Sequence, residues 1–381
     1  MPSRAAPDRA APVRPLPRSL DTLPGESLAG YVLRLAHRLE LSPACLGLLT
    51  GLTTPGHPTL PNRHMLHLRP DIAAAFTHST RLTESETGRL CLSAWHDRYP
   101  AVDLTYDQQS WRGRATAPPT ARWIASGPTH YCPQCLTGDG SPVQHTHGGA
   151  WRATWRLGVV FACVEHRRLL RYTCPGCDRP ANSTGPRPVT RSLGNGLLPG
   201  SGVRGLHPAQ CRTILGTGRR GPLLCGTRLD HTGPARQPPS RQLLAVQNRL
   251  DDLLRPDRPE PTPVMGRPAS PRDYFHDLRL LVGLLRLSWP EPADQAPPWI
   301  DTDLIDTTLD AEQAAARAGR STQNHALHHG PHRIPRPTAT CSPWPTTSSP
   351  PTARPPCGVP ELCTGSLICG DRALRGSVAC S

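Results

Sequence analysis

Paired cysteines and histidines in the middle of the chain constrain its fold more than any other feature of the sequence. Three pairs have a two-residue spacer and two single cysteines follow, which gives Cys132, Cys135, Cys163, His166, Cys174, Cys177, Cys211 and Cys225. A two-residue spacer lets both side chains of a pair point at one metal ion, and four such ligands close a tetrahedral zinc site. Eight ligands are the number that two closed sites need. The sequence therefore predicts two structural Zn²⁺ ions in this segment.

The order of the ligands along the chain favours a sequential pairing. In this pairing the first zinc is held by Cys132, Cys135, Cys163 and His166, and the second by Cys174, Cys177, Cys211 and Cys225. An alternative joins the second and third pairs in one site, because only seven residues separate His166 from Cys174. Cys211 is the least constrained ligand, since His207 or His231 could replace it.

Closed zinc sites argue against catalysis. Eight protein ligands leave no open coordination position, which a hydrolytic zinc requires. The sequence has no HExxH motif, and neither Cys-x-x-Cys pair is preceded by the proline of the zinc deaminases. A nuclease or transposase would need three converging acidic residues, and residues 111–230 hold only Asp139, Glu165, Asp178 and Asp230. We expect a protein that is not an enzyme.

Positive charge is concentrated on the same segment. The formal net charge of the chain is +14, and residues 111–230 contain sixteen arginines and four acidic residues, an excess of twelve positive charges. Such a concentration suits binding to the phosphate backbone of DNA through counterion release. The alternative is a basic surface without a ligand. All 43 basic residues are arginine, which excludes a Walker-type phosphate loop and Schiff-base chemistry, because both need lysine.

The candidate DNA contacts are the arginines that lie near the cysteine pairs. They are Arg152, Arg156, Arg167, Arg168, Arg171, Arg219 and Arg220. Trp151 and Trp155 each precede an arginine and could stack on bases. We favour a packing role for both tryptophans, because small zinc modules have little other core.

Helical periodicity flanks the zinc segment on both sides. Apolar residues at helical spacing predict helices at 27–39, 43–51, from Pro70, and 84–96, which form a helix-turn-helix-like N-terminal domain. The second helix offers no Arg, Asn or Gln to a base edge, so Arg63 and Arg69 are better contact candidates there. Further helices are expected at 240–254, 272–289 and 307–317. The core face of the helix at 272–289 is expected to hold Phe275, Leu278, Leu281, Val282 and Leu285.

These patterns predict a mostly α-helical protein with a central zinc-ribbon-like region of two small β-rich modules. The expected division is a disordered segment at 1–19, a helical domain at 20–110, a double zinc-binding region at 111–235, a C-terminal helical region at 236–320, and a disordered low-complexity tail at 321–381. No run of 18 uncharged apolar residues suggests a membrane span, and the N-terminus lacks the apolar stretch of a signal peptide. We therefore expect a cytoplasmic protein without a membrane partner.

Three stretches of the sequence resemble the TniQ family of transposition proteins. They are LPGESLAGYVLRLA, YCPQCL and WRATWRLGVVFACVEHRRLLRYTCPGC, and the similarity extends over about residues 16–290. The resemblance implies an N-terminal helix-turn-helix region, two zinc modules, and an accessory role in choosing the target site. It also implies partners: target DNA or an RNA-guided complex, an ATPase transposition regulator and a transposase. A zinc-containing transcriptional regulator of mobile DNA is the alternative, and the oligomeric state stays open, with a homodimer as one alternative.

Overall fold

The computed structural model describes most of the chain between Val13 and Asp310. The described residues are 13–102, 123–124, 129–183, 197–218, 221–231, 238–255, 262–264, 267–303, 305–307 and 309–310, with the side chains of 262–264 and 267–268 left out. Arg219 and Arg220, most of the predicted N-terminal segment 1–19, and the predicted tail 321–381 lie outside these ranges.

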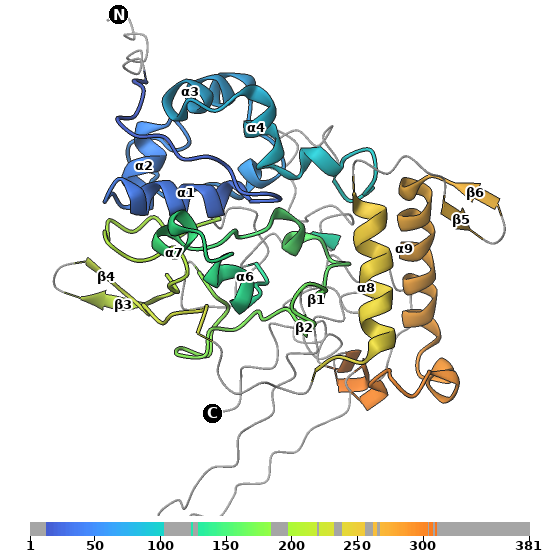
Figure 1. Ribbon diagram of the computed structural model, residues 1–381. Coiled ribbons are helices and arrows are strands. Elements are labelled where there is room, and N and C mark those ends of the chain that lie inside the picture. The colour runs from blue at the N-terminus through green and yellow to red at the C-terminus, as the bar shows by residue number, and fades with distance from the viewer. Residues whose placement is uncertain are drawn as a thin grey trace, which may run out of the picture.

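The N-terminal part is a small helical bundle (Figure 1). It contains α1 (Leu28–Arg38), α2 (Pro43–Leu49), η1 (Asn62–Met65), α3 (Pro70–Thr80), α4 (Glu84–Arg89) and η2 (Leu92–Trp95), where η denotes a 3-10 helix. The hydroxyls of Ser27 and Ser42 cap α1 and α2 by accepting the N–H groups of Gly30 and Cys45. The first two predicted helices and the predicted start of the third at Pro70 are confirmed.

The fourth predicted helix, at 84–96, is wrong as a single element. A capping box between Thr83 and Glu86 starts α4 at the predicted residue 84, but α4 ends at Arg89 and Cys91 is extended. The reason is a tertiary contact, because the carbonyl of Leu90 accepts the N–H of Leu28 at 2.8 Å. The Leu90 carbonyl therefore bonds the first residue of α1, and the chain after Cys91 forms the separate helix η2.

Helix α1 is buried on all sides, although its sequence predicted one apolar face. Every residue from Leu28 to Ala36 is buried, because the other N-terminal helices cover one side of α1 and the cysteine-rich segment covers the other (Figure 1). The backbone of Ser27 donates to the carbonyl of Trp151 at 2.7 Å. A Cβ at Gly30 would lie 2.8 Å from the Cβ of Trp151, so only glycine permits this approach.

The cysteine-rich middle of the chain contains short elements. These are α6 (Pro133–Thr137), α7 (Pro142–His147), η4 (Ala153–Arg156), β1 (Ala162–Cys163), β2 (Arg168–Leu169), β3 (Ile214–Gly218) and β4 (Gly221–Leu224). The strands form two antiparallel two-stranded sheets, β1–β2 and β3–β4. The mostly helical fold with small sheets near the cysteine clusters is confirmed.

The C-terminal part pairs two helices (Figure 1). It contains α8 (Arg241–Leu254), β5 (Thr262–Val264), β6 (Arg267–Ala269), α9 (Pro271–Ser288) and η5 (Glu291–Gln295). Both helices begin at a serine cap, at Ser240 and Ser270. Residues 302–303, 305–307 and 309–310 are helical, which is earlier than the predicted 307–317, and residues beyond 310 lie outside the described part.

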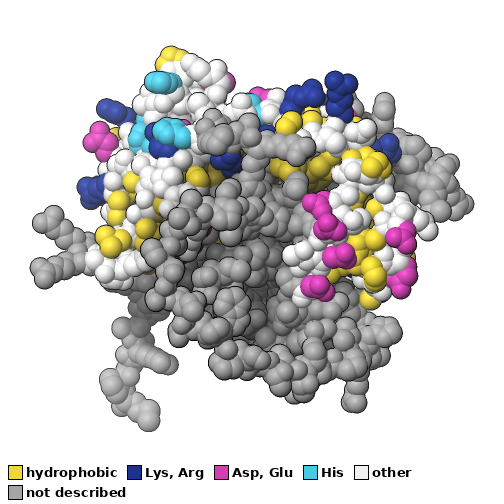
Figure 2. All heavy atoms as spheres, turned by 90° about the horizontal axis from the view of Figure 1, so that it is seen from below, with side chains coloured by type: hydrophobic (Ala, Val, Ile, Leu, Met, Phe, Trp, Pro, Cys, Tyr) yellow, Lys and Arg dark blue, Asp and Glu magenta, His cyan; other side chains and the backbone are white. Residues whose placement is uncertain are grey.

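The predicted core face of α9 is only partly correct. Phe275 and Val282 are buried and Leu278 is half-buried against the core. Leu281 and Leu285 are 56% and 42% exposed. The described elements that cover α9 lie on one side of it, so the leucines on the opposite side keep contact with solvent. Figure 2, seen from below, shows acidic side chains beside hydrophobic ones at the end of the molecule where α8 and α9 lie.

One hydrophobic core joins the three parts of the chain. It runs from Leu16 and the N-terminal helices through Trp151 and Cys163 to Leu250 on α8 and Phe275 on α9. The described helices include none that is both long and apolar enough to cross a membrane.

Candidate metal centres

The first group of potential metal ligands consists of Cys132, Cys135, Cys163 and His166. One ligand atom from each residue lies within 4.8 Å of the others, and the three cysteines are buried. His166 Nδ1 is 3.3 Å from both Cys135 Sγ and Cys163 Sγ, and these two sulfurs are 3.6 Å apart. A tetrahedral zinc with Zn–S bonds of about 2.3 Å holds its sulfur ligands about 3.8 Å apart. The observed spacing therefore suits one ion at the centre.

Local structure brings these four ligands together. Cys132 and Cys135 lie at the start of α6, where Pro133 begins the helix. Cys163 ends strand β1, and His166 lies in the turn that leads to β2. The backbones of Tyr131 and Arg171 exchange two hydrogen bonds, of 2.7 and 2.8 Å, which join the two halves of the site.

The second group consists of Cys174, Cys177, Cys211 and Cys225, again with ligand atoms within 4.8 Å of one another. Cys174 Sγ and Cys225 Sγ are 3.7 Å apart. The structure therefore brings the eight residues together in the sequential pairing, and the alternative that joins Cys163 and His166 to Cys174 and Cys177 is not observed. Cys211 completes the second group, whereas the ring of His207 packs against His37 with centroids 5.3 Å apart.

The thiols of each group cannot all ionise without a cation. Hydrogen bonds from Cys135 and Cys163 lower the pKa of Cys132 to about 3, while the hydrogen bonds of Cys135 with Cys132 and Cys163 raise the pKa of Cys135. In the second group, hydrogen bonds from Cys174 and Cys177 lower the pKa of Cys211 to about 2, and the pKa of Cys177 is raised by the same kind of bond. A divalent cation would remove this conflict, because it stabilises every thiolate that binds it. The donor sets fit zinc, and with four protein ligands each site would be closed and structural.

Comparison with known families finds a match that covers the N-terminal helices and part of the cysteine-rich segment. Residues 17–170 match the TniQ family model. The chain carries a TniQ domain. The family is associated with transposition, and its members are generally non-catalytic accessory proteins. Comparison with curated proteins finds no match. The TniQ match includes the N-terminal helices and the first group of ligands, whereas the second group and α8 follow it in the sequence.

Groups outside the ligand sets support both candidate centres. In the second, Thr213 and Thr227 each lie two residues after a cysteine, and their hydroxyls are 3.2 and 3.1 Å from the sulfurs of Cys211 and Cys225. A Cβ at Gly176 would lie 2.0 Å from Thr227 Oγ1, so the turn between Cys174 and Cys177 requires glycine here. The repeated Cys-x-Thr spacing is a signal for these threonines that the sequence analysis missed.

The first centre of the TniQ domain is also held by α8. The side-chain oxygen of Gln247 accepts the N–H groups of Phe161 and Ala162 at 2.8 and 3.0 Å, directly before Cys163. Gln247 is fully buried, and its amide nitrogen donates to Asp251 at 2.8 Å. A glutamine on the apolar face of a predicted helix is the only sequence signal for this role. Because its partners are 85 and 86 residues away, they could not be named in advance.

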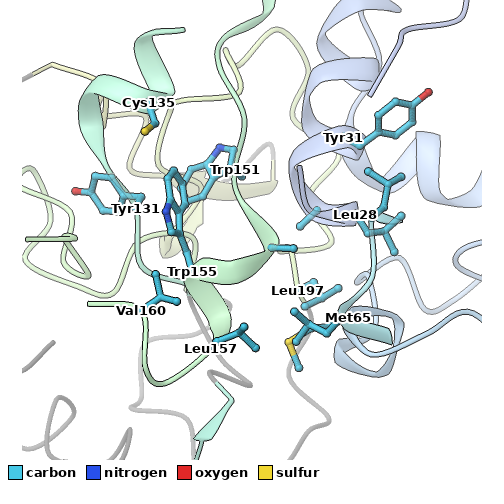
Figure 3. Packing of buried hydrophobic residues seen from close by; sticks show 14 of the residues in the cluster. Leu28, Tyr31, Met65, Tyr131, Cys135, Trp151, Trp155, Leu157, Val160 and Leu197 are labelled. Carbon is cyan, nitrogen blue, oxygen red and sulfur yellow. The ribbon is translucent and has the colours of Figure 1, made fainter. Parts of the chain in front are cut away.

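The two tryptophans of the TniQ domain pack in its interior, which confirms the favoured interpretation. Trp151 and Trp155 are each 2% exposed, and their rings meet edge to face with centroids 6.4 Å apart. Figure 3 shows them between Tyr131 and Cys135 on one side and the α1 residues Leu28 and Tyr31 on the other. Trp151 Nε1 donates to the carbonyl of Pro208 at 3.1 Å. Trp151 therefore connects α1, the first centre and the loop that leads to Cys211.

The candidate DNA-contact arginines differ in their exposure. Arg156 and Arg171 are 3% and 8% exposed, and this burial disfavours contact with a DNA backbone. Arg152 forms an ion pair of 2.6 Å with Glu165, and Arg168 donates to Gln134 at 3.2 Å. Arg167 is exposed and follows His166 directly. Arg219 and Arg220 lie outside the described residues.

Both DNA-contact candidates of the helix-turn-helix-like domain already have partners within the protein. Arg69 forms an ion pair of 2.5 Å with Asp71 at the start of α3, and Arg63 also has an interaction partner. Within α2, Leu46 is buried, while Leu48 and Leu49 are 46% and 45% exposed. A second helix with exposed leucines and without base-reading side chains is suited to packing.

Proposed function

We propose that this chain is a zinc-binding accessory protein that links recognition of target DNA to the transposition machinery. The observation that carries the proposal is the coincidence of two closed ligand groups with the most basic segment of a chain that has a TniQ domain. Bound zinc would supply a rigid framework and no chemical step. The DNA-contact residues would be the accessible arginines of this framework, above all Arg167 and Arg168.

The distribution of charge favours one orientation for the DNA. Residues 111–230 carry an excess of twelve positive charges, whereas residues 291–310 contain six acidic residues and no arginine. Acidic side chains gather beside hydrophobic ones on the α9 side of the molecule in Figure 2. A DNA duplex is attracted to the first segment and repelled by the second. The acidic end would therefore point away from DNA and remain free for a protein partner.

A bridging experiment tests this function. Immobilised duplex DNA is incubated with the ATPase regulator and the transposase of the same element, with and without this chain. We expect the chain to bind the duplex in a salt-dependent manner and to raise the amount of regulator or transposase retained. Retention that does not depend on the chain would overturn the linking role. Absence of DNA binding by the zinc-loaded chain at low salt would overturn the DNA-recognition role.

A further inference from the structure

A small open pocket lies between the first candidate metal centre and α8. It has a volume of about 320 Å³ and is lined by Val164, Arg167, Arg241, Leu244 and Ala245. Val164 and Arg167 flank His166 in the turn after strand β1, and the other three residues lie on the first turns of α8. Figure 1 shows α8 beside β1 and β2. The pocket is therefore bounded by two elements far apart in the sequence.

The chemistry of the lining favours an anion attached to a less polar body. Two of the five lining residues are arginines, three are aliphatic, and none is acidic. Within the described part of the chain, neither the Arg167 nor the Arg241 guanidinium makes an ion pair or a side-chain hydrogen bond, in contrast to Arg152 with Glu165. Two guanidinium groups without internal acceptors are suited to phosphate oxygens.

Both walls of the pocket are fixed in position. Gln247, less than two turns after Arg241 on α8, accepts the backbone N–H groups of Phe161 and Ala162. Leu244 is buried against the core, so the first turns of α8 cannot move without breaking packing. The opposite wall follows Cys163 and includes the ligand turn. A rigid pair of walls holds the arginines in place before any ligand binds.

We propose that this pocket binds one sugar–phosphate unit of a DNA backbone, with the phosphate between Arg167 and Arg241 and the deoxyribose against Val164, Leu244 and Ala245. The inference rests on the proposed function and deepens it, because Arg241 lies on α8, outside the region that matches the TniQ family. Contact with the backbone carries no base information, so the pocket fixes the position of the DNA without reading its sequence.

The test measures binding of the full chain to two fluorescent duplexes of unrelated sequence, by anisotropy at several salt concentrations. Arg167→Ala and Arg241→Ala should each weaken binding about tenfold, as expected for the loss of a charge-assisted hydrogen bond. Each should also reduce the slope of log affinity against log salt by about one, equally for both duplexes. The double variant should lose less than the product of the single losses, because both arginines hold the same phosphate.

Two further variants separate the pocket from general charge. Arg249→Ala removes the same charge from an exposed position two turns further along α8, and it should change affinity less than twofold. Ala245 is exposed four residues after Arg241, so Ala245→Glu should pair with Arg241, occupy the pocket and weaken binding while the helix is kept. Ala245→Gln is its neutral control and should bind more tightly than Ala245→Glu.

The outcomes distinguish this inference from the proposed function. If the unmodified chain binds DNA and the pocket variants bind it as tightly as Arg249→Ala does, the pocket assignment is overturned and the proposed function stands. If the loss of DNA affinity in the double variant equals the product of the two single losses, the two arginines make independent contacts. That result would also overturn the shared pocket. If the unmodified chain binds neither duplex, DNA recognition itself is overturned.

Discussion

One buried ion pair connects α1 with the segment that precedes it. Arg34 Nη1 lies 2.8 Å from Glu26 Oε2, and both side chains are 0% exposed. Burial raises the pKa of Glu26 to about 7, although the neighbouring Arg34 acts in the opposite direction. Glu26 belongs to the LPGES stretch that precedes α1. Its backbone also forms an isolated antiparallel β-bridge with Arg152 in the cysteine-rich part. The ion pair therefore lies where the helical bundle meets the cysteine-rich part.

We expect Arg34→Ala to destabilise the protein by about 3–5 kcal/mol, because it leaves the Glu26 carboxylate buried without a partner. The double variant Glu26→Gln, Arg34→Met should cost less than Arg34→Ala, since no charge is then buried alone. Urea unfolding at pH 7.5 measures both free energies. A cost below about 1 kcal/mol for Arg34→Ala would contradict the role of the pair.

A buried histidine makes part of the stability depend on pH. His64 is 0% exposed, its Nε2 is 2.9 Å from the carbonyl of Leu52, and burial lowers its pKa to about 4. An unfolded histidine titrates near 6.5. The unfolded state therefore binds the proton first, and the stability present above pH 6.5 is lost as the pH falls towards 4.

Between pH 7.5 and pH 5 the contribution of His64 to the free energy of unfolding should fall by about 2 kcal/mol. His64→Gln keeps a donor for Leu52 and does not titrate, so it should lose correspondingly less stability over this range. Glu26 changes stability in the opposite direction between its ordinary pKa and about 7, but equally in both proteins. If the free energy of unfolding changes with pH by the same amount in the unmodified protein and in His64→Gln, His64 is not buried in its neutral form.

The difference between local and distant information explains which residues could be predicted. The eight ligand candidates follow from short spacings, and the structure groups them as the order along the chain indicates. The burial of Arg156 and Arg171 could not be predicted, because arginine is seldom buried and the covering groups are distant in sequence. The same holds for the break at Cys91, which depends on a contact with Leu28.

Among the elements, α8 shows how a predicted helix acquires a role that its own sequence does not reveal. Its bounds agree with the predicted 240–254 to within one residue, and Ser240 is its N-cap. Which residue would face the first metal centre depended on packing, and that residue is Gln247. Its oxygen satisfies two backbone donors that would otherwise be buried without partners next to Cys163. Helix α8 therefore stabilises the first centre from outside the matched family region.

We expect Gln247→Leu to lower the free energy of unfolding by about 2–4 kcal/mol, because two buried N–H groups lose their acceptor. It should also speed the release of one zinc to a colorimetric chelator, while the second zinc leaves at the unmodified rate. Gln242→Leu, at an exposed position of the same helix, is the control and should change neither quantity. Equal release of both ions would point to general destabilisation instead of a positioning role.

At the scale of the whole molecule, one core and two candidate metal centres make the parts interdependent. Trp151 contacts α1 and Tyr131, and its indole bonds Pro208, which precedes the second-centre ligand Cys211. The sequence predicted separate helical and zinc-binding segments, while the structure packs them around one core. Sequence periodicity describes each segment alone and does not contain the contacts between them. Loss of either metal ion should therefore destabilise parts of the protein beyond the residues that bind that ion.

Metal analysis of the full chain should find two zinc ions, and single ligand substitutions should remove them one at a time. We expect one zinc per chain in Cys135→Ser and in Cys174→Ser, and none in the double variant, because each group needs four ligands to close. Cys45→Ser is the matched control, since Cys45 is a half-buried thiol outside both groups, and it should keep two.

Removing zinc should also shift tryptophan emission to longer wavelength, since structural zinc contributes folding free energy directly and Trp151 and Trp155 lie beside the first centre. Cys135→Ser should show a larger shift than Cys174→Ser for the same reason. Two zinc ions retained by the double variant, or an emission spectrum unchanged after complete chelation, would refute the structural role of these centres.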